Sequence, residues 1–244
     1  MHATSLTAKA ALVTGASRGI GRAIALGLAA QGSSVAVAYR KNDVQAAEVV
    51  RTITESGGMA VSLQADLSQL DEIDRLFHQA EANLGPLDIV VANAADAVVK
   101  PFTECTEADY DRIFDTNAKG VFFTLQQAAR RLRDGGRIIV TSTGGTKMFF
   151  TDTSLYLGSK GAVEQFVRVL SREVATRAIT VNAVSPGFTD TDLLPDRDRT
   201  MAAELSPFGR IGTPAEVAEV AVFLASDAAR WVTGQNIGAG GGVF

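Results

Sequence analysis

The stretch that decides the fold is Thr14–Gly21, with the sequence T-G-A-S-R-G-I-G. It follows a short apolar run and precedes a stretch with helical spacing. Glycine adopts positive φ at no steric cost and lets the backbone approach a phosphate closely. The N-terminus of the following helix adds free amides and the positive end of its dipole. The turn therefore predicts an anion site, of the kind that binds a dinucleotide pyrophosphate, between a first strand and a first helix.

Strand-like and helix-like segments alternate along the rest of the chain. Short apolar runs rich in β-branched residues predict buried parallel strands, and these are Ala10–Thr14, Ser34–Tyr39, Ala60–Gln64, Leu87–Asn93, Arg137–Ser142, Thr180–Ser185 and Asn236–Gly238. Helical spacing is found over Gly19–Gln31, Val44–Ser56, Gln69–Asn83, Glu107–Arg133, Leu155–Thr176 and Pro214–Ala225. The alternation predicts one Rossmann-type α/β domain over residues 1–244, a doubly wound parallel sheet of about seven strands with helices on both faces.

One segment interrupts this alternation. From Gly187 to Gly212 no strand is predicted, and the stretch contains Pro195, Pro207 and several charges. It follows the sixth strand, at the edge of the sheet where ligands of open α/β folds bind. Irregular segments of this length in compact domains are usually functional. We expect a substrate lid at about residues 188–212; a solvated loop without a role is the alternative.

Composition excludes several classes of protein. The chain has 244 residues, of which 46% are apolar and 20% charged, and its net charge is -4. This balance is globular, and no basic run predicts nucleic-acid binding, because the basic group at residues 130–133 lies near a predicted helix end and complements its dipole. No apolar stretch reaches the length of a membrane span. We therefore expect a globular protein that binds neither nucleic acid nor membrane.

The single cysteine, the two histidines and the N-terminal residues indicate the cellular compartment and whether the chain binds a metal. Cys105 is the only cysteine, so no internal disulfide can form, which fits a reducing compartment. Met1–Lys9 lacks the apolar core of a signal peptide, and we expect a cytoplasmic protein. His2 and His78 have no partners at metal-ligand spacing. No metal site is predicted.

Tyr156 and Lys160 form the candidate catalytic pair. They stand four apart on a predicted helix, which places both side chains on one face. A free tyrosine has a pKa of about 10 and is a poor acid–base group at neutral pH. A nearby ammonium favours the phenolate and lowers that pKa. The pair is therefore suited to proton transfer at a carbonyl oxygen, although a surface pair without function has the same spacing.

These two motifs occur together with further ones, and the chain resembles the short-chain dehydrogenase/reductase family almost from end to end. The turn has the spacing T-G-x-x-x-G-x-G, and Leu155–Ala162, L-Y-L-G-S-K-G-A, is similar to the active-site helix of that family. Other segments that resemble family motifs are Asp66 and Leu67 after the third strand, Asn93-Ala94 after the fourth, Asn117, Pro186–Thr191, Gly234-Gln235 and Gly240–Gly242.

The resemblance implies a role for each catalytic residue. Tyr156 would give its proton to the carbonyl oxygen, and Lys160 would lower the pKa of that tyrosine and hydrogen-bond the nicotinamide ribose. Asn117 would hold a water that connects Lys160 to solvent. The family places a serine thirteen positions before the tyrosine to orient the substrate; here that position is Thr143, preceded by Ser142. Either hydroxyl can serve, and Thr143 is preferred because it has the family's spacing.

The cofactor-binding residues follow from the turn and from the same motifs. They are Gly15, Ser17, Arg18, Gly19, Ile20, Gly21, Arg40, Asp66, Leu67, Asn93, Ala94, Tyr156, Lys160, Pro186, Gly187, Thr189 and Thr191. One motif departs from the family pattern: N-N-A-G appears as Ala92-Asn93-Ala94-Ala95. A methyl at position 95 either is tolerated or displaces the nicotinamide ribose.

The end of the second strand bears on the choice of nicotinamide. An acid there would bind the ribose 2′-hydroxyl and select NAD. The chain instead has Arg40 at that end, with Asp43 too far beyond it, and Arg18 in the glycine turn. Guanidinium groups bind phosphate oxygens in a forked geometry. We expect NADP(H) in preference to NAD(H); two solvated arginines without this role are the alternative.

Substrate and assembly are predicted in outline. Phe149, Phe150 and Leu193 are candidates for an apolar substrate wall, although the two phenylalanines could equally pack under their loop. The resemblance implies a carbonyl reductase, with 3-oxoacyl carrier-protein reduction as the leading activity and small ketones, sugars or steroids still open. A non-catalytic NADP(H)-binding sensor or scaffold is the alternative function. The family resemblance also implies a homotetramer through the two long helices.

Overall fold

The computed structural model describes residues 5–244, and the prediction for His2 lies outside this range. All seven predicted strands are present: β1 (Ala10–Val13), β2 (Ser34–Tyr39), β3 (Ala60–Gln64), β4 (Ile89–Ala92), β5 (Arg137–Thr141), β6 (Thr180–Pro186) and β7 (Asn236–Ala239). The helices are α1 (Gly19–Ala30), α2 (Asp43–Glu55), α3 (Leu70–Leu84), α4 (Glu107–Phe114), α5 (Gly120–Arg131), α6 (Ser154–Glu173), α7 (Arg199–Leu205) and α8 (Pro214–Ala225).

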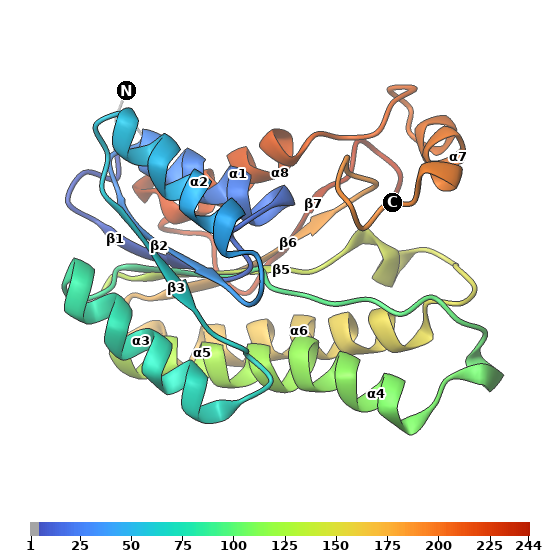
Figure 1. The fold of residues 1–244 in the computed structure, drawn as a ribbon, viewed down its shortest axis with the longest axis horizontal. Helices are drawn as coiled ribbons and strands as arrows, with labels where there is room; N and C mark the ends of the chain where they lie inside the picture. Colours follow the sequence, from blue (N-terminus) through green and yellow to red (C-terminus); the bar gives the residue numbers. More distant parts are fainter. Residues whose placement is uncertain (1–4) are drawn as a thin grey trace.

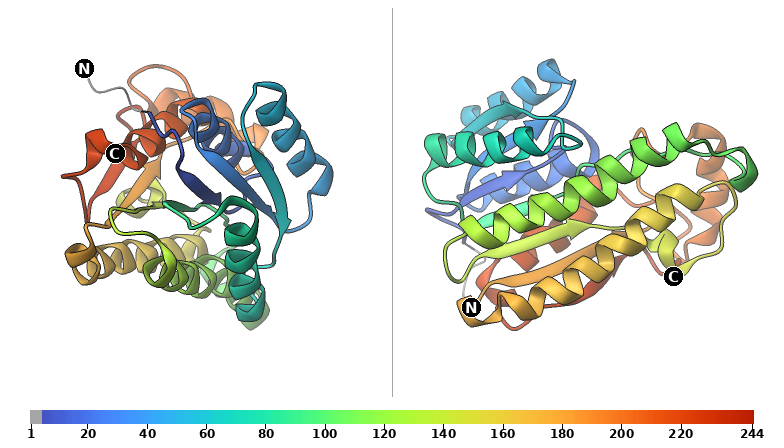
Figure 2. Two further views of the ribbon diagram at one scale, coloured as in Figure 1. Left: turned by 90° about the vertical axis from the view of Figure 1, so that its left-hand side faces the viewer. Right: turned by 90° about the horizontal axis from the view of Figure 1, so that it is seen from below.

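The seven strands form one parallel sheet in the order β3-β2-β1-β4-β5-β6-β7. Helices cover both faces: α1, α2 and α8 lie on one side, and α3, α5 and α6 on the other (Figure 1). Figure 2 shows the same layers end-on and, from below, the long helices beside each other. Each face has its own apolar core, because buried strands place alternate side chains on opposite sides. The predicted fold class is confirmed.

The strand order creates a switch point between β1 and β4. From β1 the chain proceeds to β2 and β3 on one side, and it then returns to β4 on the other side of β1. The two central strands pair in parallel, with Val13 opposite Val91. Crossovers that leave in opposite directions open a crevice at the carboxyl ends of the strands, and ligands of such sheets bind there.

The predicted helix Glu107–Arg133 is interrupted, which corrects the sequence-based expectation. A π-helical turn, η2 (Asp115–Lys119), separates α4 from α5, and Asn117 lies within it. Such turns occur mostly as single insertions in α-helices and often lie at functional sites. Periodicity did not predict the interruption, because the π-helical turn is only five residues long and differs from an α-helix in its backbone hydrogen bonds rather than in its residue types.

The predicted lid contains more regular structure than expected. The expectation was an irregular segment over residues 188–212, but η5 (Asp196–Asp198) and α7 form its middle. A parallel bridge between Thr189 and Gly212 joins the two ends of the segment. Residues 188–212 therefore leave the edge of the sheet and return to it, with their own short helix, and they are called the lid segment below after the role predicted for them. Among residues 5–244, no helix has the length and apolar character that crossing a membrane requires.

Candidate active site

A cleft of about 1600 Å³ follows the carboxyl edge of the sheet. Residues at or just beyond the ends of six strands line it: Thr14, Tyr39, Ala65, Asn93, Ser142 and Pro186. All seventeen predicted cofactor-binding residues also line it. The topology therefore gathers motifs from distant parts of the chain into one space, as the sequence pattern predicted for a ligand site.

Each glycine of the turn is required for a different steric reason. Gly15 has φ +62, and a Cβ there would lie 2.8 Å from the Ala94 backbone. A Cβ on Gly21 would overlap the carbonyl oxygen of Gly15 and the amide of Asn93. Gly19 has φ +54, a left-handed conformation that side chains rarely adopt. Any larger residue would therefore push the turn out of shape at the start of α1.

The start of α1 is open to an anion. Arg18 is the N-cap residue, its side chain makes no capping hydrogen bond, and the first turn contains no acidic residue. The first amides of a helix have no partner within the helix, and the dipole there favours negative charge. The close-packed glycine cradle and these free amides together fit a dinucleotide pyrophosphate.

Asn93 holds the glycine turn to the neighbouring strands. Its Nδ2 donates to the carbonyl oxygens of Thr14 at 3.1 Å and Gly15 at 3.2 Å, and its Oδ1 accepts from the Thr141 hydroxyl at 3.2 Å. The Asn93 amide thus supports the wall that the cofactor would contact. Ala95, which replaces a family glycine, lines the cleft without a positive φ, so its methyl causes no backbone strain.

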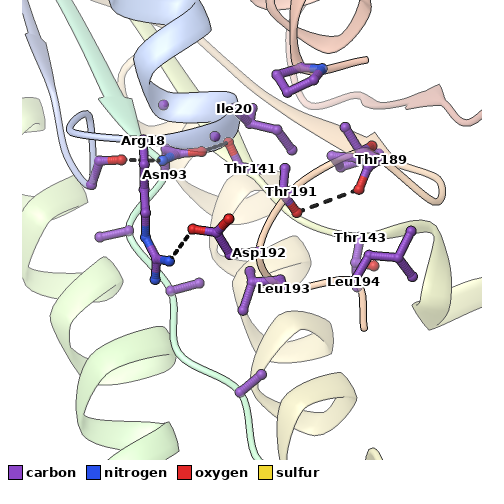
Figure 3. A pocket seen from close by; sticks show the side chains of 18 of the residues that line it. Arg18, Ile20, Asn93, Thr141, Thr143, Thr189, Thr191, Asp192, Leu193 and Leu194 are labelled. Carbon is purple, nitrogen blue, oxygen red and sulfur yellow. Dashed lines mark hydrogen bonds and ion pairs between the residues drawn. The ribbon is translucent and has the colours of Figure 1, made fainter. Parts of the chain in front are cut away.

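Two arginines lie where a 2′-phosphate was predicted, and both have ionic neighbours. Arg18 Nη1 lies 2.5 Å from Asp192 Oδ2 of the lid segment, with both side chains at least half exposed (Figure 3). Arg40 Nη2 lies 4.0 Å from Asp96 Oδ2. The carboxylate of Asp96 is bound more closely by Arg112, through two hydrogen bonds of 2.8 Å. Arg40 therefore keeps most of its donors available to the cleft.

The predicted catalytic pair lies on the floor of the cleft. Tyr156 is half-buried, and Lys160 is buried with its ammonium 5.9 Å from the tyrosine ring centroid. The Lys160 Nζ donates a hydrogen bond of 2.7 Å to the carbonyl oxygen of Thr141. Both residues project from one face of α6 toward the end of β5, as the four-residue spacing predicted.

The pKa values differ from the sequence-based expectation in one respect. Burial raises the pKa of the Tyr156 phenol, and the hydrogen bond from Thr143 lowers it by less. In the protein alone, Lys160 does not produce the predicted lowering. Burial also lowers the pKa of Lys160 to about 8, while the negative charge of Glu164 acts in the opposite direction. Loss of hydration therefore changes the pKa of each group more than the other group does, because both polar groups are removed from water.

The two candidate hydroxyls at the end of β5 point to different partners. The Thr143 hydroxyl lies close enough to the Tyr156 phenol to lower its pKa. The Ser142 hydroxyl instead donates to Glu164 Oε1 at 2.8 Å. The geometry thus favours Thr143 over Ser142 as the group beside the reacting carbonyl. No sequence motif pointed to Glu164, although its position four residues after Lys160 puts it on the same helix face.

Asn117 lies behind the cleft rather than on its surface. Its buried side chain accepts from the backbone amide of Asp96 at 2.8 Å and donates to the Asp96 carbonyl oxygen at 2.8 Å and to Ser159 Oγ at 3.1 Å. The Ser159 hydroxyl donates in turn to the Tyr156 carbonyl oxygen. The π-helical turn therefore places Asn117 where Ser159 connects it by hydrogen bonds to α6, the helix of the predicted catalytic pair.

The three predicted substrate residues do not all reach the cleft. Leu193 and Phe150 line it, and the Phe150 ring packs edge-on against Phe188 of the lid segment with centroids 5.8 Å apart. Phe149 points to solvent and lies outside the lining. Alternate residues of the extended loop face opposite ways, so only one phenylalanine of the pair can face inward. In the described chain, residues 5–244, no cluster of His, Cys, Asp and Glu could hold a metal ion.

Comparison with known proteins agrees with this arrangement. A family profile described as "Enoyl-(Acyl carrier protein) reductase" matches residues 15–244, which is nearly the whole chain. The chain belongs to the short-chain dehydrogenase/reductase family. The family resemblance stated from the sequence motifs is thereby confirmed.

Named reductases are among the relatives of this short-chain dehydrogenase/reductase. It is 42% identical to a hydroxynaphthalene reductase-like protein of Metarhizium brunneum, over 96% of this chain and 94% of the relative. It is also 42% identical to a versicolorin reductase of Emericella nidulans, over 98% and 97% of the two chains.

Solved structures give the same result for the fold. An angucycline C-6 ketoreductase with bound NADP superimposes with a TM-score of 0.94 at 43% identity, covering 98% of this chain and 96% of that one. A short-chain dehydrogenase from Burkholderia cenocepacia in complex with NADP has a TM-score of 0.94 at 35% identity, with 98% of each chain covered. This short-chain dehydrogenase/reductase is therefore similar along its full length to reductases of known structure.

Proposed function

We propose that this chain is an NADPH-dependent carbonyl reductase. The observation that carries the proposal is the placement of Tyr156, Thr143 and Lys160 on the floor of a cleft that also contains the glycine turn. The proton donor and the pyrophosphate cradle therefore share one open space. An enzyme that transfers a hydride from a dinucleotide to a carbonyl requires both in the same cavity.

The chain's own residues handle the proton and the carbonyl oxygen. When bound, the nicotinamide supplies the hydride. The Thr143 hydroxyl orients the carbonyl oxygen beside the Tyr156 phenol. The raised pKa of that phenol keeps it protonated at neutral pH, which is the form that a general acid needs. The Lys160 ammonium favours the phenolate that remains after proton transfer, and the hydrogen bond to Thr141 fixes the position of that ammonium.

The cofactor preference for NADP(H) rests on two observations. Arg40 and Arg18 border the cleft, and both side chains are partly exposed; Arg18 is also paired with Asp192, and Arg40 lies 4.0 Å from Asp96. Proteins with similar structures carry NADP, among them the angucycline C-6 ketoreductase and the Burkholderia cenocepacia dehydrogenase. Guanidinium groups at the ribose end would pair with the 2′-phosphate, which NADH lacks.

The substrate that we propose is a ketone on a fused aromatic ring system. Relatives are named for hydroxynaphthalene, versicolorin and angucycline substrates. In this chain, Phe150, Phe188 and Leu193 give the cleft an apolar wall beside the catalytic residues. A flat aromatic ketone would bury its faces against such a wall. A 3-oxoacyl thioester, the leading activity expected from the sequence, is the second substrate class.

The test is NADPH oxidation, followed at 340 nm, with three kinds of substrate: a tetralone or naphthol-derived ketone, a 3-oxoacyl thioester and a simple aliphatic ketone. Tyr156→Phe is the matched variant, because it removes only the hydroxyl. We expect the aromatic ketone to be reduced fastest and the variant to lose nearly all turnover. Equal rates for wild type and Tyr156→Phe would remove the phenol from the mechanism. Tight NADPH binding without turnover on any substrate would favour a sensor.

We also propose a cytoplasmic homotetramer. The outer face of α5 and α6 carries Phe122, which is 42% exposed, and Val169, which is 58% exposed, with Phe122 packed edge-on against Phe166. Exposed apolar side chains on two adjacent long helices favour burial against another copy. The single cysteine is compatible with a reducing compartment. Light scattering of the purified protein would give the mass of four chains, and a monomer mass would contradict the assembly.

A further inference from the structure

Three side chains of α6 form a stripe beneath the turn that follows β5. Tyr156, Lys160 and Glu164 are spaced four residues apart, so they lie one above another on the same helix face. Residues 141–146 pass over this stripe. The established family motif accounts for the first two members, and the third has no role in the proposed reaction.

Each member of the stripe holds a different part of the turn. Tyr156 has the Thr143 hydroxyl as its polar neighbour, close enough to lower the pKa of the phenol, and Lys160 donates a hydrogen bond to the carbonyl oxygen of Thr141. Glu164 accepts from two hydroxyls with one oxygen: Ser142 Oγ lies 2.8 Å and Thr146 Oγ1 lies 2.7 Å from Glu164 Oε1. Hydrogen bonds to a carboxylate are shorter and stronger than those between neutral groups. Glu164 therefore ties together the residues on either side of Thr143.

The turn fixes its backbone better than it fixes the Thr143 side chain: residues 144–147 form a 3₁₀ turn, and the Thr146 hydroxyl lies 3.0 Å from the Thr143 carbonyl oxygen as well as near Glu164. Thr143 is followed by Gly144 and Gly145, and glycine restricts the backbone less than any other residue. Within the turn, the Thr143 side chain accepts only a 3.2 Å hydrogen bond from the Gly145 amide. The contacts of Glu164 with Ser142 and Thr146 add a support for the Thr143 side chain from outside the turn.

We propose that Glu164 is a positioning residue for carbonyl reduction, which closes the 142–146 turn through Ser142 and Thr146 and so holds Thr143 against Tyr156. The proposal rests on the proposed function. Glu164 does not line the cleft, so it acts through Thr143 rather than on the substrate. It also explains why Ser142, adjacent to the position expected for the substrate-orienting hydroxyl, faces away from the reacting group.

An alternative role for Glu164 is that of a counter-ion for Lys160. The two side chains are close enough for the carboxylate to raise the pKa of Lys160. The Lys160 ammonium instead donates to Thr141, and Glu164 Oε1 accepts from two hydroxyls. The contacts therefore favour a role for Glu164 in positioning the turn over a role in balancing the charge of Lys160. A neutral side chain that still accepts hydrogen bonds should replace Glu164 in the first role but not in the second.

Glu164→Gln and Glu164→Ala separate these roles. Glutamine keeps a side-chain oxygen that accepts hydrogen bonds and removes the charge, whereas alanine removes both. At pH 6, where Lys160 stays protonated, we expect Glu164→Gln to retain kcat within about threefold and Glu164→Ala to lower it by about tenfold or more, because small misplacements of orienting groups are costly. NADPH affinity should be unchanged in both. Glu173→Ala, an exposed glutamate of the same helix, is the matched control and should leave kcat unchanged.

Thr146→Val adds a test that leaves the stripe intact. It removes one of the two donors to Glu164 and should lower kcat by a few-fold, less than Glu164→Ala does. Full kcat in Glu164→Ala would overturn the proposal. Equal losses in Glu164→Gln and Glu164→Ala would also overturn it, because the charge and not the acceptor would then matter.

A second measurement does not depend on turnover. In protein with ¹³C-labelled threonine methyl groups, the Thr143 signal should shift in Glu164→Ala and stay near its wild-type position in Glu164→Gln. An unchanged Thr143 signal in Glu164→Ala would refute the positioning role. If the wild type reduces no ketone at all, the proposed function fails, whereas this signal still decides what Glu164 does to the turn.

Discussion

Arg18 and Asp192 form an ion pair of 2.5 Å across 174 positions of sequence, and this pair joins the glycine turn to the first part of the lid segment. Arg18 is the N-cap residue of α1, and Asp192 follows the Thr189–Thr191 stretch that lines the same cleft (Figure 3). The side chain expected to bind the 2′-phosphate therefore already has an anionic partner. Phosphate and carboxylate would compete for one guanidinium.

The first prediction follows from this competition. Asp192→Asn should raise the affinity for NADPH by a few-fold, since exposed ion pairs contribute only about 0–1 kcal/mol. The affinity for NADH should stay constant because NADH has no phosphate at that position. Fluorescence titration of both dinucleotides measures the two values. An equal loss of affinity for both would show that the pair acts on lid closure instead.

The second prediction concerns Arg40. Arg40→Asp should reduce the preference for NADPH over NADH by about tenfold or more, because a forked cation is replaced by an anion at the predicted phosphate site. Arg51→Asp on the exposed side of α2 makes the same charge change outside the cleft and serves as the control. The ratio of kcat/KM values for the two cofactors is the measurement. A preference that persists in Arg40→Asp would assign the selection to other residues.

The third prediction separates Thr143 from Ser142. Thr143→Val keeps the shape and removes the hydroxyl, and it should lower kcat by about 10²-fold, the usual effect of losing one preorganised donor. Thr143→Ser should retain most of the activity. Ser142→Ala should cost less than Thr143→Val, because the Ser142 hydroxyl faces Glu164. Steady-state kinetics with the best ketone decides, and a larger loss in Ser142→Ala would reverse the assignment.

The fourth prediction uses the contact between Gly144 and Phe244. A Cβ at Gly144 would overlap the Phe244 ring, which also lies against Gly238 and Gly240. Gly144→Ala should therefore destabilise the protein by about 1–3 kcal/mol, the usual cost of overpacking. Adding Phe244→Ala should recover part of that loss, since the effects of substitutions at two residues in contact are not additive.

Chemical denaturation of the single and double variants tests this contact. Gly161→Ala is the control, because no atom lies within 4 Å of its added Cβ and the position is helical. Alanine there should be neutral or stabilising. Additive losses in Gly144→Ala and Phe244→Ala would mean that the ring does not fill the space above the turn.

The fifth prediction concerns pH and stability. The folded-state pKa of Lys160 is lowered from 10.5 to about 8, so between these values the unfolded chain binds more protons than the folded one. The free energy of unfolding should therefore rise with pH in this window, by about 2 kcal/mol from pH 8 to pH 10 relative to Lys160→Met. Unfolding of both proteins by urea at the two pH values measures the difference. A constant difference would mean that Lys160 has an ordinary pKa.

Much of the site could be predicted from local sequence. Gly15 and Gly21 are needed for a turn whose shape depends on neighbouring backbone, and Tyr156 and Lys160 share a helix face by spacing alone. The interruption at Asn117 could not be predicted, because a π-helical turn differs from an α-helix in its backbone hydrogen bonds, which side-chain spacing over five residues does not reveal. The exposure of Phe149 could not be predicted either, since nothing in a loop sequence determines which of two adjacent phenylalanines faces inward.

The sequence by itself determined the alternation of strands and helices, the glycine turn before α1 and the shared helix face of Tyr156 and Lys160. These depend on short-range rules: side-chain periodicity, backbone freedom at glycine and the spacing of one helical turn. Only the tertiary structure decided which hydroxyl meets Tyr156, which carboxylate faces Arg18 and that Glu164 supports the turn after β5. Those contacts join residues that are distant in sequence, and their distances depend on how the sheet, the helices and the lid segment pack together.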